Sequence, residues 1–194
     1  ILLSIPGLED QHTWMSLPFF ISYLVAFLGN SLIIFIIITE CSLHEPMYLF
    51  LCMLAVADLI LSTTTVPKAL AIFWFYAGAI SLGGCVTQIF FIHATFIEES
   101  GILLAMALDR YVAISHPLHY ALTMNSQRCV LLVAVSWVIT ILHALVHTLL
   151  VTRLSFCGPN IIPHFFCDLV PLLKLACSST CVNDLVLILV AGTL

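Results

Sequence analysis

Residues Met106–Tyr120 read MALDRYVAISHPLHY. Asp109 and Arg110 stand side by side at the end of the apolar run Cys85–Leu108, although only 8% of the residues are charged. A long apolar run that ends in charged residues is typical of a helix leaving a membrane at its polar surface. The stretch therefore predicts where a membrane helix ends and a polar segment begins.

The composition of the whole chain points to the same environment. Of the 194 residues, 62% are hydrophobic, and the mean hydropathy is +1.20. Soluble domains are about half apolar and about a quarter charged. Five basic and ten acidic residues are too few to cover a soluble globule, so the chain belongs in a lipid bilayer. The net charge of -5 is dispersed and offers no basic patch for nucleic acid.

Long apolar runs predict the membrane-spanning helices. Four runs are long enough to cross a bilayer, which takes about 20 apolar residues. They are Leu17–Thr39, Tyr48–Ile72, Cys85–Leu108 and Cys129–Val151. A fifth run begins near Leu185 and is still apolar at the last residue. Because the sequence also begins without methionine, we expect a partial chain.

The cysteines suggest how the helices are oriented. The basic residues number two on one side of the membrane and three on the other, which does not decide the orientation. Cys85, Cys157, Cys167 and Cys177 fall on a single side. Cysteines collected on one face favour an oxidising, extracellular side with disulfides, and free thiols on an ordinary loop are the alternative. Four cysteines allow three pairings, and their spacing does not choose among them.

Three polar residues fall at one depth near the middle of the membrane. Counted along their helices, Asn30, Asp58 and Glu99 lie roughly 14, 15 and 16 Å from the cysteine-poor surface. Intramembrane polar groups of this kind are usually functional. With two carboxyls so close, either one is protonated or a cation is bound, for which sodium is the best candidate. A structural hydrogen-bond cluster is the alternative. Glu98 points about 100° away from Glu99 around the helix. It either faces a neighbouring helix or is protonated.

Three histidines lie nearer the cysteine-rich surface. His93 on one run and His143 and His147 on the next occupy the same outer third of the predicted bundle. The neighbours Phe96 and Ile97 are apolar, so a pocket here would be apolar with a histidine to read a polar group on a small ligand. The spacing of His143 and His147 also allows a metal site, but no further ligand is evident.

The sequence was also compared with what an enzyme, a transporter or a channel would require. The His-Glu-x-x-His, Gly-x-Ser-x-Gly and phosphate-loop motifs are absent, so an enzyme is not expected. An ion-coupled transporter or channel would explain the carboxyls at mid-depth. The lack of an internal repeat and of interrupted helices counts against a transporter.

Taken together, these motifs resemble olfactory receptors, a branch of the rhodopsin-like G-protein-coupled receptors. The resemblance covers essentially the whole chain, and the fifteen-residue opening stretch is its most specific part. Two motifs, IPGLED at 5–10 and FCGPNIIPHFFC at 156–167, resemble the class I, fish-like branch. The other motifs that carry the resemblance are Gly29-Asn30, LHEPMY at 43–48 and LAVADL at 54–59.

The resemblance implies an all-α membrane protein, a seven-transmembrane helix bundle in which this chain supplies helices 1–4 and the start of helix 5. It also implies a plasma-membrane location with an extracellular N-terminus, and disulfides Cys85–Cys167 and Cys157–Cys177. Within the partial receptor domain 1–194, the expected bounds are 1–16 for the outer tail, 17–39, 48–72, 85–109 and 129–151 for four helices, 152–182 for the second extracellular loop, and 183–194 for the start of the fifth helix.

By the same resemblance, a small volatile or hydrophilic odorant would bind in the outer half of the bundle, with carboxylic acids among the ligands. The implied ligand-binding residues are Ile92, His93, Phe96, Ile97, His143, Ala144, His147 and Val170. The implied partner is a stimulatory, olfactory-type G protein that raises cAMP. Asp109 and Arg110 would form a latch, paired in the inactive state, and the implied coupling residues are Asp109, Arg110, Tyr111, Ser115, His116, Pro117 and Leu118.

The sequence departs from the olfactory receptor pattern at two positions. Ser115 stands where the family usually has cysteine, and Glu98 is an extra acid beside the family's usual acidic position at Glu99. No cofactor is expected other than a sodium ion at Asn30, Asp58 and Glu99. If the 194 residues were the whole product, a non-signalling fragment would be expected, because two helices would be missing from the pocket and the G-protein cleft.

Overall fold

The computed structural model describes residues 1–2, 12–40, 45–120, 124–157, 161–162 and 164–191. Four of its helices are long and apolar enough to cross a membrane. These are α1 (His12–Thr39), α2 (Pro46–Phe75), α3 (Leu82–Ser115) and α5 (Ser126–Thr152). The shorter elements are η3 (Pro117–His119), α6 (Leu169–Leu173) and α7 (Cys181–Ala191).

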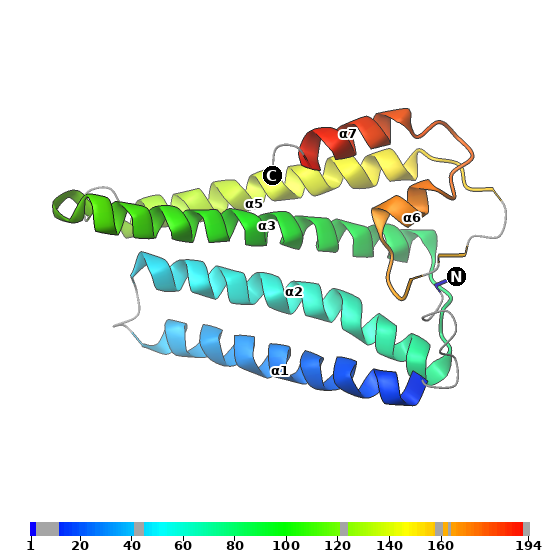
Figure 1. Cartoon of the computed structure of the whole chain (residues 1–194), viewed down its shortest axis with the longest axis horizontal. Helices are drawn as coiled ribbons and strands as arrows, with labels where there is room; N and C mark the ends of the chain where they lie inside the picture. Colours follow the sequence, from blue (N-terminus) through cyan, green and yellow to red (C-terminus); the bar gives the residue numbers. More distant parts are fainter. Residues whose placement is uncertain (3–11, 41–44, 121–123, 158–160, 163, 192–194) are drawn as a thin grey trace.

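The long helices form a bundle in which neighbours in sequence are neighbours in space. Helix α1 packs on α2, α2 on α3, and α3 on α5, while α7 lies along α5 (Figure 1). Short links make consecutive helices antiparallel. Large apolar side chains such as Leu28 and Phe35 are more than 60% exposed, as expected for surfaces that meet hydrocarbon rather than water.

Most helix ends lie beyond the apolar runs that predict them, although α1 ends with its run at Thr39. α2 begins with Pro46 at its first position, where the missing N–H costs nothing. α3 begins three residues before Cys85 because the Ser81 hydroxyl caps it, accepting a hydrogen bond from the Gly84 N–H at 3.0 Å. It also continues six residues past Asp109, beyond the charged pair at which the apolar run ends. Asn125 caps α5 in the same way as Ser81 caps α3.

One end of the bundle, called here the disulfide end, comprises residues 76–81 and the described part of 153–180 together with Ile1 and Leu2. The segment 152–182, expected to be a loop, includes α6 and the first residues of α7. Leu2 is 2% exposed, and its N–H donates to the Gly78 carbonyl at 2.7 Å. The Ile162 N–H donates to the Ile1 carbonyl at 2.9 Å, so three distant segments meet at this end.

The opposite end, called here the DRY end, comprises Asp109–Tyr120 and residues 124–129. A buried apolar cluster lies between this end and mid-depth, where α2, α3 and α5 meet. Phe50, Ile102, Cys129 and Val133 form its core. This packing fixes the position of α3, the helix that runs the full distance between the two ends (Figure 1).

Candidate functional site

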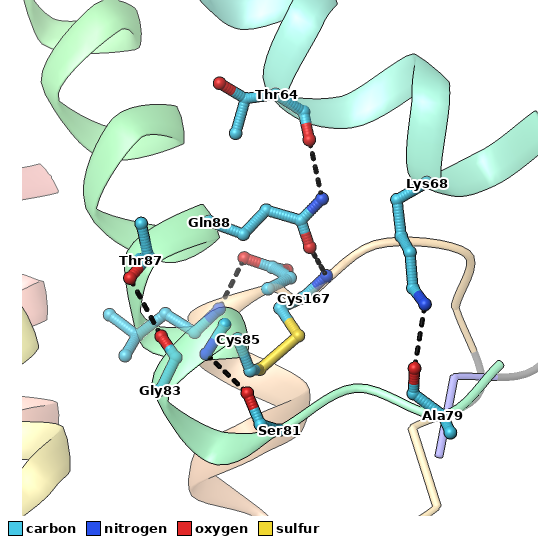
Figure 2. The surroundings of a disulfide bond; sticks show 12 residues. Thr64, Lys68, Ala79, Ser81, Gly83, Cys85, Thr87, Gln88 and Cys167 are labelled. Atoms are coloured by element: carbon cyan, nitrogen blue, oxygen red, sulfur yellow. Dashed lines mark hydrogen bonds between the residues drawn. A yellow bond between two sulfur atoms is a disulfide. The ribbon is translucent and has the colours of Figure 1, made fainter. Parts of the chain in front are cut away.

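The disulfide end is held by two disulfides and one buried glutamine. Cys85 is bonded to Cys167 and Cys157 to Cys177, the two pairs that the resemblance implied. Figure 2 shows Gln88 between α2 and the loop, where its Nε2 donates to the Thr64 carbonyl at 2.9 Å and its Oε1 accepts from the Cys167 N–H at 2.8 Å. The segment around Cys167 is therefore fixed to both α2 and α3.

A lysine reinforces the same region from the side of α2. The Lys68 ammonium donates to the Ala77 carbonyl at 2.7 Å and to the Ala79 carbonyl at 2.8 Å, and Figure 2 shows the second bond. These carbonyls belong to the link that follows Tyr76, whose backbone φ of 53° ends α2 in the left-handed region. The link is thus held against α2 by one charged side chain.

The three histidines predicted to lie at one depth do come together. The ring centroids of His93 and His147 are 5.6 Å apart, and those of His143 and His147 are 5.0 Å apart. His147 is only 2% exposed. Its Nε2 lies 3.2 Å from Nε2 of His143, so one of these nitrogens donates and the other accepts.

The third imidazole has a defined proton position. Nδ1 of His93 lies 3.0 Å from the Ile89 carbonyl, which only accepts, so Nδ1 carries the proton. The other ring nitrogen, Nε2, is left to bond to another group. Within the described ranges, no group of three or more histidine, cysteine or acidic residues is arranged to hold a metal ion.

The other predicted ligand-binding residues divide into two groups. Ala144 is fully buried, and Ile92 and Ile97 are half-buried beside the histidines. Phe96 and Val170 are instead 62% and 43% exposed. The structure therefore gathers an imidazole cluster with an apolar rim, and leaves two of the predicted residues on its surface.

At mid-depth, two of the three predicted polar residues meet. The side chains of Asp58 on α2 and Glu99 on α3 interact directly. One oxygen of Glu99, Oε1, is buried and has no hydrogen-bond partner. Asn30 is half-buried on α1. The neighbouring Glu98 turns toward α5, where its Oε2 accepts a hydrogen bond from the Ser136 hydroxyl at 2.9 Å.

The DRY end places its two charged residues in different surroundings. Asp109 is 2% exposed, and its Oδ1 accepts a hydrogen bond from the Tyr120 hydroxyl at 2.7 Å. Arg110 is exposed and contacts the sulfur of Met47 through its guanidinium group. In the part of the chain that the structure describes, no ion pair joins Asp109 to Arg110, so the expected latch pairing is not formed here.

The tyrosine that holds Asp109 stays protonated under physiological conditions. Burial and the hydrogen bond to Asp109 raise the pKa of Tyr120 to about 12. The remaining predicted coupling residues form an exposed surface around the end of α3 and η3, with Leu118 91% and Tyr111 64% exposed. Ser115, His116 and Pro117 are also exposed.

Comparison with known proteins places this arrangement in a family. A family model described as olfactory receptor matches residues 19–194. The chain belongs to the olfactory receptor family. This match and the four long apolar helices confirm the predicted fold class, an all-α membrane protein of the seven-helix receptor type. Membership also agrees with the prediction that the protein is a receptor rather than an enzyme.

Individual olfactory receptors are similar over nearly the whole chain. Human olfactory receptor 52B4 is 57% identical over 185 residues, which cover 94% of this chain and 58% of the relative. Rat olfactory receptor 1468 is 50% identical over 98% of this chain and 60% of its own length. Human olfactory receptor 51E2 is 49% identical over 94% of this chain and 57% of its own length. The chain thus spans about three fifths of the length of these curated relatives.

Sequence reasoning missed two residues of this olfactory receptor chain. The sequence could have pointed to Gln88, because it is a lone amide inside the apolar start of α3 and a buried amide needs hydrogen-bond partners. Tyr120 lies in the quoted stretch, but its bond to Asp109 depends on how the chain turns back through η3. Helical periodicity carries no information about such a turn.

Proposed function

We propose that the chain forms the odorant-binding and signalling framework of an olfactory receptor in the plasma membrane. A small volatile or hydrophilic organic molecule would bind beside the histidines and shift the receptor toward a state that activates a stimulatory, olfactory-type G protein and raises cAMP. The single observation that carries this proposal is the course of α3. One continuous helix holds His93 near the disulfide end and Arg110 at the DRY end.

The imidazole cluster has the chemistry of a pocket for a small polar ligand. Ligand sites are mostly apolar, with a few polar groups that fix orientation. Ala144, Ile92 and Ile97 supply apolar surface, while His93 and His147 offer hydrogen-bonding nitrogens. A hydroxyl or carboxylic acid group on the odorant would bond to these nitrogens. Phe96 and Val170 would complete the pocket together with parts of the receptor outside this chain.

The disulfide end is proposed to be extracellular, with the N-terminus on that side. Disulfides form and persist in oxidising compartments such as the cell exterior. Both disulfides lie at this end of the bundle, and the described cysteines at the DRY half are free thiols. Odorant would then reach the histidines from outside the cell, and the G protein would meet the DRY end in the cytoplasm.

Signal transfer would be a shift in population between two arrangements. A ligand stabilises whichever state it binds better. In the resting state, the Tyr120 hydroxyl holds Asp109 and thereby the turn after α3. In the active state, Arg110 and the exposed coupling surface around Tyr111 and Leu118 would contact the G protein.

A sodium ion is proposed to bind between α2 and α3 at mid-depth. Asp58 and Glu99 supply carboxyl oxygens, which hard cations prefer, and the unpartnered Oε1 of Glu99 fits a missing ligand. The ion would neutralise charge that is otherwise costly inside a membrane. Asn30 would contribute from α1.

The proposal is tested in cells that express a full-length receptor carrying this chain together with a cAMP reporter. An odorant panel that includes short carboxylic acids and alcohols should give a concentration-dependent response. His147→Phe should reduce this response at unchanged surface amount, whereas the matched change His164→Phe, at an exposed loop histidine, should not. Arg110→Ala should remove the cAMP response and keep odorant binding. Odorant-independent ion currents without cAMP would instead support a channel or transporter.

A further inference from the structure

A cavity lies in the DRY half of the bundle, well away from the histidines. Its volume is about 190 Å³, and its walls come from α2, α3 and α5. Most of the wall is apolar, and Phe50, Ile102 and Val133 are its buried parts. Neither the imidazole cluster nor the exposed coupling surface contributes to the wall, so neither accounts for this cavity.

One wall residue of the cavity is an acid that is fully withdrawn from solvent. Glu98 is 0% exposed. Its Oε2 accepts hydrogen bonds from the hydroxyls of Ser136 at 2.9 Å and Thr140 at 3.3 Å. Its Oε1 is buried without a hydrogen-bond partner. An unpaired buried carboxyl oxygen is unfavourable, so the cavity presents one acceptor without a hydrogen bond on a mostly apolar wall.

We propose that this cavity is a second small-molecule site, which takes a small membrane-soluble alcohol. The hydroxyl would bond to Oε1 of Glu98, and the hydrocarbon part would lie against Ile102, Ala105 and Val133. A hydroxyl suits the acid in either protonation state, because it donates to a carboxylate and accepts from a carboxylic acid. An ammonium group would instead bury a charge among apolar side chains, which is costly.

The volume limits the size of the alcohol. An apolar cavity of about 150 Å³ in another protein binds benzene, so this cavity fits an alcohol with a ring or chain of about six to eight carbons. Drug-sized ligands need about 300 Å³ or more. A single water fits less well, because it needs two to four polar partners and the wall offers chiefly Glu98 and Ser136.

The rim of the cavity indicates how such a molecule would enter. Leu104, Leu108 and Leu132 line it and are 62%, 51% and 54% exposed. These side chains belong to helices that are long and apolar enough to cross a membrane, so the rim would open toward the hydrocarbon region. A small alcohol partitions into that region and would enter laterally, without passing the histidines.

Photolabelling of a full-length receptor carrying this chain, reconstituted in lipid vesicles, tests the site directly. The probe is an eight-carbon alcohol with an alkyl diazirine, and the control probe is the matching alkane diazirine without a hydroxyl. Mass spectrometry of the digested receptor locates the label. The alcohol probe should label peptides containing 101–108 and 132–136, free octanol should compete, and the alkane should label them about three- to tenfold less, as expected for one lost hydrogen bond.

Two variants and one matched control separate a site from general partitioning. Ala105→Phe fills the cavity and should reduce labelling at least about tenfold, whereas Ala107→Phe, an exposed position outside the cavity on the same helix, should leave it unchanged. Glu98→Leu should lower labelling by the alcohol to that of the alkane.

Three results would overturn the proposal: equal labelling by alcohol and alkane, equal labelling of the Ala105→Phe and Ala107→Phe variants, or no label in these peptides. Because the label is read by position, a failure here is distinct from a failure of odorant binding at the histidines.

Discussion

The two ends of α3 are held in opposite ways. At the disulfide end, a covalent bond from Cys85 and two hydrogen bonds from Gln88 fix the loop to the helices. At the DRY end, a side-chain hydrogen bond from Tyr120 to Asp109 joins the turn to the helix, and the exposed Arg110 contacts only a methionine sulfur in the part of the chain that the structure describes. The difference indicates that one end preserves the shape of a pocket while the other can change arrangement at low energetic cost.

The largest effect is expected from opening the covalent bond. Cys85→Ser removes a disulfide that joins residues 82 positions apart. Loss of a native disulfide costs about 2 to 5 kcal/mol, so we expect a large fall in thermal stability and little receptor at the cell surface. Thermal unfolding in detergent and surface labelling measure this. Cys181→Ser, at an exposed free cysteine, is the control and should behave as the native chain.

Removing the glutamine should weaken the same end without breaking a covalent bond. Gln88→Leu keeps the apolar packing but leaves the Thr64 carbonyl and the Cys167 N–H without their partner. Unpaired buried polar groups cost about 1 to 3 kcal/mol, which a shift in the thermal midpoint would report. Thr87→Val on the exposed side of the same turn should change little. Equal shifts for the two variants would contradict the role given to Gln88.

A smaller loss of stability is expected at the DRY end. Tyr120→Phe deletes one hydroxyl and with it the hydrogen bond to Asp109. One such bond contributes about 1 kcal/mol, more when a charged group accepts it, so the thermal midpoint should fall by less than in Gln88→Leu. A thermal midpoint of Tyr120→Phe below that of Gln88→Leu would contradict the claim that the DRY end is held less firmly than the disulfide end.

The same pair predicts a pH dependence at high pH. The pKa of Tyr120 is raised to about 12 from its ordinary value of 10.0. A group whose pKa is raised on folding stabilises the protein fully below its unfolded pKa and loses that effect as pH rises through the folded pKa. The advantage of the native chain over Tyr120→Phe should therefore be constant up to about pH 9 and decline between pH 10 and 12. Thermal midpoints of both proteins measured across this range check the prediction.

The smallest effect on stability is expected at the exposed coupling surface. Leu118 is 91% exposed, so Leu118→Ala should change the free energy of unfolding by less than about 0.5 kcal/mol. Its maximal odorant-driven cAMP response should nevertheless fall, because the side chain would be buried against the G protein. An unchanged response would remove Leu118 from the proposed coupling surface.

Much of the fold could be predicted from the sequence because hydropathy reports on the membrane directly. The runs 17–39 and 129–151 carry no charged residue and 48–72 carries only Asp58 and Lys68, far fewer than a water-exposed helix would carry. Each run falls inside an observed helix. Helix ends were less predictable. Ser81 and Asn125 extend their helices through capping hydrogen bonds, and a hydropathy pattern does not register such bonds.

The contacts of the candidate site could be predicted where they depend only on the depth of residues along their helices. They could not be predicted where they depend on the rotation of one helix against another or on a turn of the chain. Counting residues brought His93 to the level of His143 and His147, and the structure groups these rings. Counting could not show that Glu98 reaches Ser136, because that depends on how α3 and α5 are rotated against each other. Likewise, the bond from Tyr120 to Asp109 follows from the turn at η3.

Basal cAMP production per surface receptor tests the contrast between the two ends most directly. In Tyr120→Phe, losing about 1 kcal/mol from the resting state should raise the active population, and hence basal cAMP, by about fivefold. In Gln88→Leu, fewer receptors should reach the surface, but each should keep the native basal activity. Raised basal activity in Gln88→Leu together with native activity in Tyr120→Phe would contradict the assignment of the switch to the DRY end.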